Sequence, residues 1–170
     1  MKRQILIILL TAVVFTTALA QDKSKRPSPP VAVQGTIEGV SVKVDYSAPS
    51  AKGRKMLGGI EPFGKVWRTG ANEATVFEID KAVTVEGQAL AAGKYELFTI
   101  PAEGEWTIIF QKYGKQWGAY DYKESNDVLR VKVKPGKAPA FVETFAINVD
   151  KSQVTIQWEN TLVAFGVKKG

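Results

Sequence analysis

The sequence predicts an all-β protein: a single antiparallel β-sandwich, Ig-like or jelly-roll-like, with about eight to ten strands. Three observations predict this fold. Apolar side chains recur at every second position along most of the chain after residue 31, which is the period of a half-buried strand. Runs rich in Gly, Pro and Asp separate these segments at roughly the 8–12-residue spacing that is typical of sandwiches and barrels. No stretch keeps the 3.6-residue period of an amphipathic helix.

The alternation is clearest in three segments, residues 40–46, 128–134 and 153–159. In the first, valines at every second position and Tyr46 alternate with polar residues, which predicts one face toward a core and one toward water. Further strands are expected from residue 31 onward and at residues 74–80, 82–86, 94–100, 105–111, 141–149 and 162–167. A single helical turn is the most that we expect, near Glu73 or at residues 124–127.

The first twenty residues have the features of a cleavable signal peptide. Lys2 and Arg3 form a positive start, residues 5–20 are apolar apart from three threonines, and the run ends in Ala18-Leu19-Ala20. This small-x-small ending is a cleavage pattern, and no later segment has the ~20 apolar residues that a membrane span needs. We therefore expect cleavage after Ala20, a periplasmic or extracellular location, and no stable membrane insertion of the mature chain.

Residues 21–30 (QDKSKRPSPP) are polar, basic and rich in proline. This composition predicts a flexible, extended leader. Residues 31–170 contain no second linker and no internal repeat, so we expect them to form one domain.

The chain contains no histidine and no cysteine. This excludes Ser–His–Asp triads, Cys–His pairs, thiolate chemistry and zinc sites with His ligands. No calcium-binding Asp-x-Asp-x-Asp-Gly loop occurs either, and we expect no cofactor and no metal. The formal charge of +6 becomes +4 without Lys2 and Arg3 (21 basic against 17 acidic residues). The basic residues do not cluster, so we do not expect nucleic-acid binding.

Several motifs occur together along the chain. They include Asp45-Tyr46-Ser47-Ala48-Pro49-Ser50, Trp67-Arg68-Thr69-Gly70-Ala71-Asn72-Glu73-Ala74-Thr75, Gly93-Lys94-Tyr95-Glu96-Leu97-Phe98 and Gln116-Trp117-Gly118-Ala119-Tyr120-Asp121-Tyr122. Together they resemble the exported bacterial family named domain of unknown function 2911, over about residues 26–167. The resemblance implies export and supports the domain boundaries. It implies no activity, because the family has none established.

Polar side chains are densest at residues 64–75, in a segment that shows no strand-like alternation. Arg68 offers donors in a planar fork that suits a carboxylate or phosphate. Trp67 offers a flat apolar face, and Asn72 offers both a donor and an acceptor. With Glu73, these residues predict a groove for a small anionic or sugar-like ligand. The structural alternative is an Arg68–Glu73 ion pair, with Asn72 fixing a turn and Trp67 in the core.

A second cluster contains aromatic rings at high density, and we expect two of them, Trp117 and Tyr120, to flank this groove. Exposed rings can stack against sugars or apolar peptide groups. The alternative is that the rings pack over an open end of the sandwich as a small additional core.

These features predict a non-enzymatic binding or structural module of the envelope, whose partner is an unidentified small ligand or envelope protein. Two alternatives stay open. A glycan hydrolase would need two facing carboxyl groups, one with a raised pKa, and Glu73, Asp80, Asp121 and Asp127 are candidates. A protein-interaction domain would need a flat apolar patch or an exposed strand edge.

Overall fold

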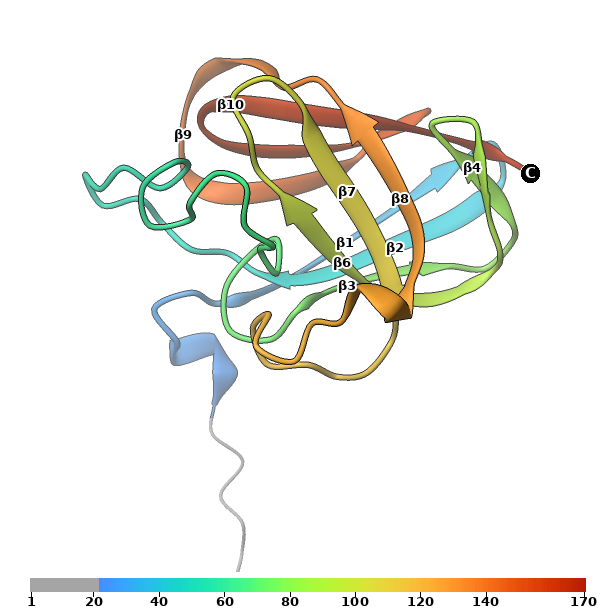
Figure 1. Ribbon diagram of the computed structural model, residues 1–170, viewed down its shortest axis with the longest axis horizontal. Helices are drawn as coiled ribbons and strands as arrows, with labels where there is room; N and C mark the ends of the chain where they lie inside the picture. Colours follow the sequence, from blue (N-terminus) through green and yellow to red (C-terminus); the bar gives the residue numbers. More distant parts are fainter. Residues whose placement is uncertain (1–21) are drawn as a thin grey trace, which may run out of the picture.

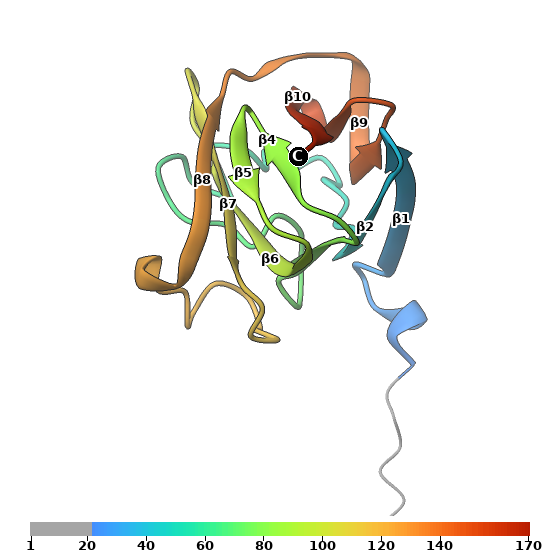
Figure 2. The same cartoon turned by 90° about the vertical axis from the view of Figure 1, so that its right-hand side faces the viewer.

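The computed structural model describes residues 22–170, and the predicted signal peptide lies outside them. The described residues form two antiparallel sheets packed face to face (Figures 1 and 2). The strands are β1 Pro30–Ile37, β2 Val40–Ser47, β3 Thr75–Ile79, β4 Val83–Val85, β5 Gln88–Leu90, β6 Gly93–Ile100, β7 Trp106–Lys112, β8 Asp127–Val133, β9 Gly136–Val149 and β10 Gln153–Lys169. One sheet has the order β1-β2-β3-β6-β7-β8 and the other the order β5-β4-β10-β9. The predicted all-β sandwich is confirmed.

Most strands follow the two-residue period of the sequence. In β2 the side chains of Val40, Val42 and Val44 are fully buried, and the residues between them are only partly buried. One prediction is wrong: residues 153–159 and 162–167 belong to one strand, β10, rather than two. The apparent break is an irregularity in the β9–β10 pairing around Glu159, whose φ is +52°.

The core between the sheets is built from large aromatic side chains. Phe77 of β3 and Phe110 of β7 meet edge to face with a centroid distance of 5.1 Å, and both contact Phe165 of β10 from the opposite sheet. Such edge-to-face pairs place the positive ring edge against the negative ring face. The apolar side chains at alternate positions therefore lie on one face of each sheet, and these two faces pack together around a shared aromatic core.

The outer face of the six-stranded sheet is also partly covered. Phe98 and Ile109 point away from the main core but are fully buried, together with Ala74. Residues 113–126, between β7 and β8, fold over them, and the ring of Tyr122 lies edge-on to Phe98 at 5.2 Å. A turn of 3-10 helix, η2 Glu124–Asn126, lies within this loop at one of the two positions where we expected a helical turn.

The leader makes more contacts than its composition indicates. Its described part begins with a 3-10 turn, η1 Lys23–Lys25, whose N-cap Asp22 accepts a hydrogen bond from the backbone of Ser24. Arg26, which caps this turn, has an extended backbone, residues 26–28 form a bend, and Pro30 begins β1. The backbone N–H of Ala48 donates to the carbonyl of Pro29 at 2.9 Å, so this segment is tied to the sandwich.

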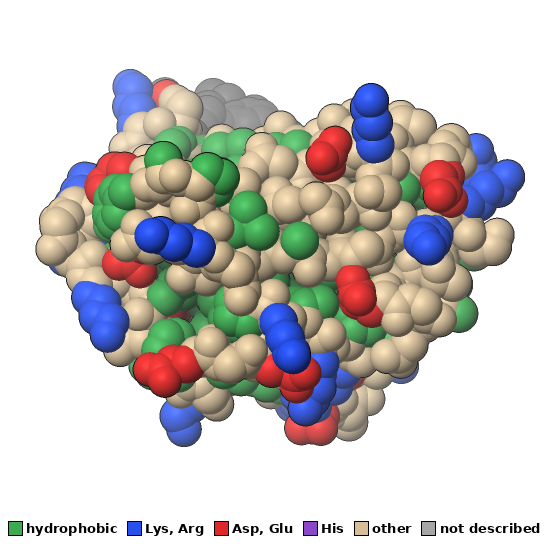
Figure 3. All heavy atoms as spheres, turned by 90° about the horizontal axis from the view of Figure 1, so that it is seen from above, with side chains coloured by type: hydrophobic (Ala, Val, Ile, Leu, Met, Phe, Trp, Pro, Cys, Tyr) green, Lys and Arg blue, Asp and Glu red, His purple; other side chains and the backbone are tan. Residues whose placement is uncertain are grey.

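Charges on the surface are mixed. On the face shown in Figure 3, Lys and Arg side chains stand singly among Asp and Glu side chains. Within residues 22–170, no helix has the length and apolar character required to cross a membrane.

Candidate functional site

Three segments that are distant in sequence meet at one end of the sandwich: the leader, the loop before β3 and the loop after β7 (Figure 1). The two loops form an isolated antiparallel bridge between Glu73 and Trp117. In this bridge the N–H of Ala74 donates to the carbonyl of Gln116 at 3.0 Å, and the N–H of Gly118 donates to that of Asn72 at 2.9 Å. The structure thus brings together Asn72, Glu73 and Trp117, three of the six residues that we assigned to the groove.

Backbone geometry fixes the loop that carries Asn72 and Glu73. Asn72 and Thr69 have φ values of +59° and +56°, a region that Asn tolerates better than most residues. The hydroxyl of Thr75 donates to the carbonyl of Thr69 at 2.6 Å, and the N–H of Ala71 donates to that of Ser47 at 3.1 Å. These bonds hold the loop in one conformation against β2 and β3.

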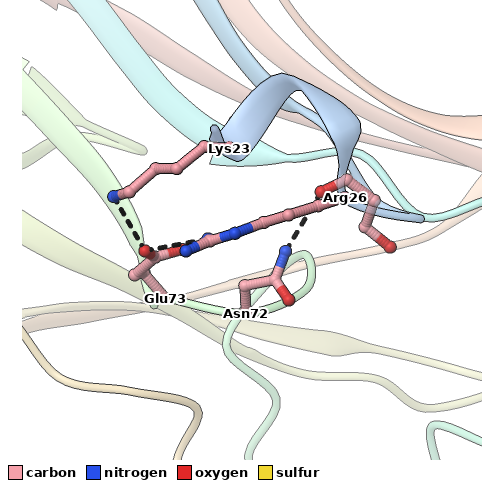
Figure 4. Close-up of polar contacts among 5 residues, drawn as sticks. Lys23, Arg26, Asn72 and Glu73 are labelled. Carbon is pink, nitrogen blue, oxygen red and sulfur yellow. Dashed lines mark hydrogen bonds and ion pairs between the residues drawn. The ribbon is translucent and has the colours of Figure 1, made fainter. Parts of the chain in front are cut away.

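Glu73 is the centre of an ion-pair network with the leader (Figure 4). Nζ of Lys23 donates to Oε1 at 2.9 Å, and Nη1 of Arg26 donates to both carboxylate oxygens at 3.0 and 2.9 Å. Burial alone would raise the pKa of Glu73, but the hydrogen bonds from Lys23, from its own backbone N–H and from Arg26 outweigh burial and lower the pKa to about 2. Glu73 is therefore an anion at any physiological pH.

Arg26 and Ser28 complete the attachment of the leader. The Arg26 side chain is only 16% exposed, and its guanidinium lies 5.8 Å from the centroid of the Trp117 ring, within the range of a cation–π contact. Nδ2 of Asn72 donates to the backbone carbonyl of Ser28 at 3.0 Å (Figure 4). All three clustered residues therefore contact the leader.

Trp67 does not lie in the groove, which corrects our expectation. Its side chain is 3% exposed and stacks on Trp158 at a centroid distance of 5.7 Å. Backbone hydrogen bonds in both directions with Thr99 hold it against β6, and its Nε1 donates to the carbonyl of Gly70. Trp67 is a core residue, as the structural alternative proposed.

Arg68 and Tyr120 also lie apart from the cluster. The Arg68–Glu73 ion pair of the structural alternative is absent among the described residues, because Lys23 and Arg26 pair with the carboxylate. Arg68 is half-buried, and its Nε has no hydrogen-bond partner within residues 22–170. Burial raises the pKa of Glu61, and the positive charge of Arg68 partly offsets that effect. Tyr120 is 84% exposed.

A pocket of about 330 Å³ lies beside Glu73, on the outer face of the six-stranded sheet. The residues that line it include Lys23 of the leader, Asp45 of β2, Glu73, Glu96 of β6, Tyr113 and Gln116. Glu73 thus belongs both to the leader contact and to the pocket wall. Of the six residues that we assigned to the groove, Glu73 lines this pocket and Trp67, Arg68, Asn72, Trp117 and Tyr120 do not.

Glu96 anchors the floor of the pocket. Its side chain is 1% exposed, and its two oxygens accept hydrogen bonds from the backbone N–H and the Nε2 of Gln116, at 2.7 and 2.5 Å. Nε2 of Gln116 also donates to Oε1 of Gln111 at 2.6 Å, which leaves the buried Oε1 of Gln116 without a donor. The floor is therefore a fixed polar network, in which the acceptor without a partner among residues 22–170 is Oε1 of Gln116.

Sequence reasoning missed the residues that complete this site, namely Lys23, Arg26, Glu96 and Gln116. The basic leader and the acidic residue in a polar loop were visible separately, but no spacing rule connects residues about fifty positions apart. Glu96 occupied an ordinary outward position in a strand pattern, and its burial depends on the loop that covers it.

The lowered pKa of Glu73 rules this residue out as the general acid of a glycosidase. A carboxyl group with a pKa of about 2, such as Glu73, cannot donate a proton near neutral pH. Burial raises the pKa of Glu61, but that residue does not line this pocket. Within the described part of the chain, no three acidic side chains are arranged to hold a metal ion.

Comparison with known proteins gives one family. A family model described as "Protein of unknown function (DUF2911)" matches residues 28–167. No curated protein and no solved structure matches the chain. The match covers nearly all of the described sandwich and agrees with the motifs noted in the sequence, so the chain belongs to the DUF2911 family of proteins of unknown function.

Proposed function

We propose that this protein is a non-enzymatic binding module, and that its ligand is a small, hydroxyl-rich molecule of about the size of a monosaccharide. The observation that carries the proposal is the pocket of about 330 Å³ beside Glu73. Its volume lies at the lower end of the range for ligand pockets, roughly 300–1,000 Å³. A rigid sandwich that carries loops at one end is a common way to present such a pocket.

The lining indicates the chemical class. Three carboxylates (Asp45, Glu73 and Glu96) and two lysines (Lys23 and Lys115) line the pocket, so its charges largely balance and it favours a neutral ligand that can hydrogen-bond to both kinds of group. Hydroxyl groups can donate to these acceptors, and the exposed ring of Tyr113 offers a face on which a sugar can stack. The anionic ligand that we also considered depended on Arg68, which does not line the pocket.

We also propose export to the periplasm or the exterior, with cleavage after Ala20. The support is the N-terminal sequence: a basic start, an apolar run and Ala18-Leu19-Ala20. Mass spectrometry of the protein recovered from the exported fraction tests this. A mature chain that starts at Gln21 is expected, and an intact N-terminus in the cytoplasmic fraction would contradict it.

A ligand screen tests the binding proposal. Saturation-transfer NMR and thermal shift are measured for wild type against neutral monosaccharides and disaccharides, small anions and amines. Val76→Phe is the blocking variant, because Val76 lines the pocket and is only partly buried on the outer face of β3. Val128→Phe is the matched control: the same change at an exposed valine of β8 outside the pocket.

We expect at least one neutral sugar to bind wild type and Val128→Phe but not Val76→Phe. A ligand at one hundred times its Kd should stabilise the fold by about 2.7 kcal/mol. A ligand that binds all three proteins equally would place the site elsewhere. A screen in which no sugar binds folded wild type would refute the proposed ligand class, and binding of anions alone would reverse it.

A further inference from the structure

We infer that Asn72, Glu73 and Trp117 form a receptor for an arginine that precedes proline in a polypeptide segment, and that the chain's own leader fills this receptor. The inference goes beyond the proposed function, because it concerns the surface under the leader and does not depend on the ligand of the neighbouring pocket. It identifies the partner by its chemistry: a polypeptide segment in which proline follows arginine.

The three residues that form the receptor all belong to loops of the sandwich. Asn72 and Glu73 lie in a loop with two residues at positive φ, bonded to β2 and to the Trp117 loop through the backbone. None of these backbone bonds involves residues 22–29. The receptor is therefore preorganised, which lowers the cost of binding any segment that fits it.

The contacts with the leader are those of side-chain recognition. The Arg26 guanidinium meets the Glu73 carboxylate at 2.9–3.0 Å and lies over the Trp117 ring. Asn72 donates to the carbonyl of Ser28. Because this contact is with the backbone, it fixes the position of the segment and does not depend on the side chain at that residue. Proline after Arg26 favours the observed extended backbone, with φ −67° and ψ 147°. Together these groups select a planar cation whose own backbone is extended and which is followed by proline.

The leader, which occupies the receptor, buries little of its own surface. Of residues 22–30, only Arg26 and Ser28 are partly buried, and the η1 turn buries no residue. Segments with few buried apolar contacts open at low free-energy cost. The leader can therefore leave the receptor while the sandwich stays folded, and another segment of the same chemistry can replace it.

Competition with the leader sets the expected affinities. A tethered segment has an effective concentration of about millimolar for a short flexible link. A peptide in solution must overcome this concentration to bind wild type, but not to bind a variant whose leader has lost its cations. Binding should therefore become stronger when Lys23 and Arg26 are removed, which is the opposite of what loss of a direct contact would produce.

The test uses the whole chain and a fluorescent peptide with the sequence DKSKRPSPP, which is that of residues 22–30. Fluorescence polarisation measures its binding to wild type, to Lys23→Ala/Arg26→Ala and to the same double variant with Glu73→Gln added. The control protein is Arg130→Ala, which removes an ion-paired arginine of β8 that does not line this site. The control peptide has glutamine in place of arginine. Circular dichroism verifies that every variant is folded.

We expect the double variant to bind the peptide about tenfold more tightly than wild type, a difference of about 1.4 kcal/mol. Addition of Glu73→Gln should remove that gain, Arg130→Ala should behave as wild type, and the glutamine peptide should not bind. The inference fails if the folded double variant binds no better than wild type, or if Glu73→Gln leaves its binding unchanged. Neither result bears on sugar binding at the pocket, which the Val76→Phe comparison measures separately.

Discussion

Replacement of Trp67 by alanine distinguishes the core role that the structure assigns to this residue from a role in a ligand groove. The ring is almost fully buried, stacks on Trp158 and meets Phe145 edge-on at a centroid distance of 5.1 Å. Truncation of a buried aromatic side chain costs about 3–5 kcal/mol through lost transfer free energy and the cavity that remains. The variant also loses the hydrogen bond from Nε1 to the carbonyl of Gly70, which contributes about 1 kcal/mol at most sites.

A loss of this size is a large part of the total stability of a domain, about 5–15 kcal/mol. For a chain of this length it corresponds to a fall in Tm on the order of 10 °C. Urea unfolding followed by circular dichroism measures it, so that the signal does not depend on tryptophan fluorescence. The matched control is Trp117→Ala, because Trp117 is 53% exposed and loses mainly its contact with Arg26, worth about 0.5–1 kcal/mol. Equal losses of stability in the two variants would refute the assignment of Trp67 to the core.

Two further predictions concern the closure of the sandwich and the leader. Gly35→Ala places a Cβ 2.6 Å from Cγ1 of Val149 and should lower the free energy of unfolding by about 1–3 kcal/mol, because it forces β1 away from β9. In the control Gly104→Ala the new Cβ meets no atom within 4 Å, so stability should change by less than about 0.5 kcal/mol. Urea unfolding midpoints test this prediction, and equal midpoints for the two variants would contradict it. The leader should leave the sandwich only at strongly acidic pH, because the pKa of Glu73 falls from 4.5 to about 2 on folding. The contribution of ionised Glu73 to stability is therefore complete above pH 4.5, declines below that pH and is lost below about pH 2. NMR chemical shifts of the leader, followed as a function of pH, measure this release. In Glu73→Gln the shifts should no longer depend on pH in this range, and release of the wild-type leader near pH 6 would show that the pKa assigned to Glu73 is wrong.

The strands were predictable because their information is local. Burial on one face requires apolar residues at every second position, and β2, β6 and β7 lie within about a residue of their predicted ranges. The first residues of β9, from Gly136, were not predicted because most of them are exposed and carry no alternation. The short strand β5 was missed for a related reason: only one of its three residues, Leu90, is buried.

The candidate site was predictable only in part. Local polarity and aromatic density indicated the loops that hold Asn72, Glu73 and Trp117, and the structure places these loops side by side. The partner of Glu73 was not predictable, because Arg68 lies five positions away whereas Arg26 approaches only through the path of β1 and β2. An acidic residue in a polar loop indicates that an ion pair can form there, but the chain topology determines which cationic side chain lies close enough to form it.

The covering of the outer sheet face links the fold to both proposals. In a sandwich whose outer faces meet water, Glu96 would be a solvated side chain on β6; here the loop after β7 buries it and bonds it to Gln116. The same loop presents Trp117 to the leader. The pocket floor and the arginine receptor are therefore held by one rigid loop, and Glu73 faces both. Departure of the leader removes Lys23 from the pocket wall and leaves the Glu73 carboxylate free until another arginine pairs with it, so the charge of the pocket depends on what the receptor holds. Sugar affinity measured in the Lys23→Ala/Arg26→Ala variant should therefore differ from that of wild type, whereas two sites without a shared residue would titrate independently.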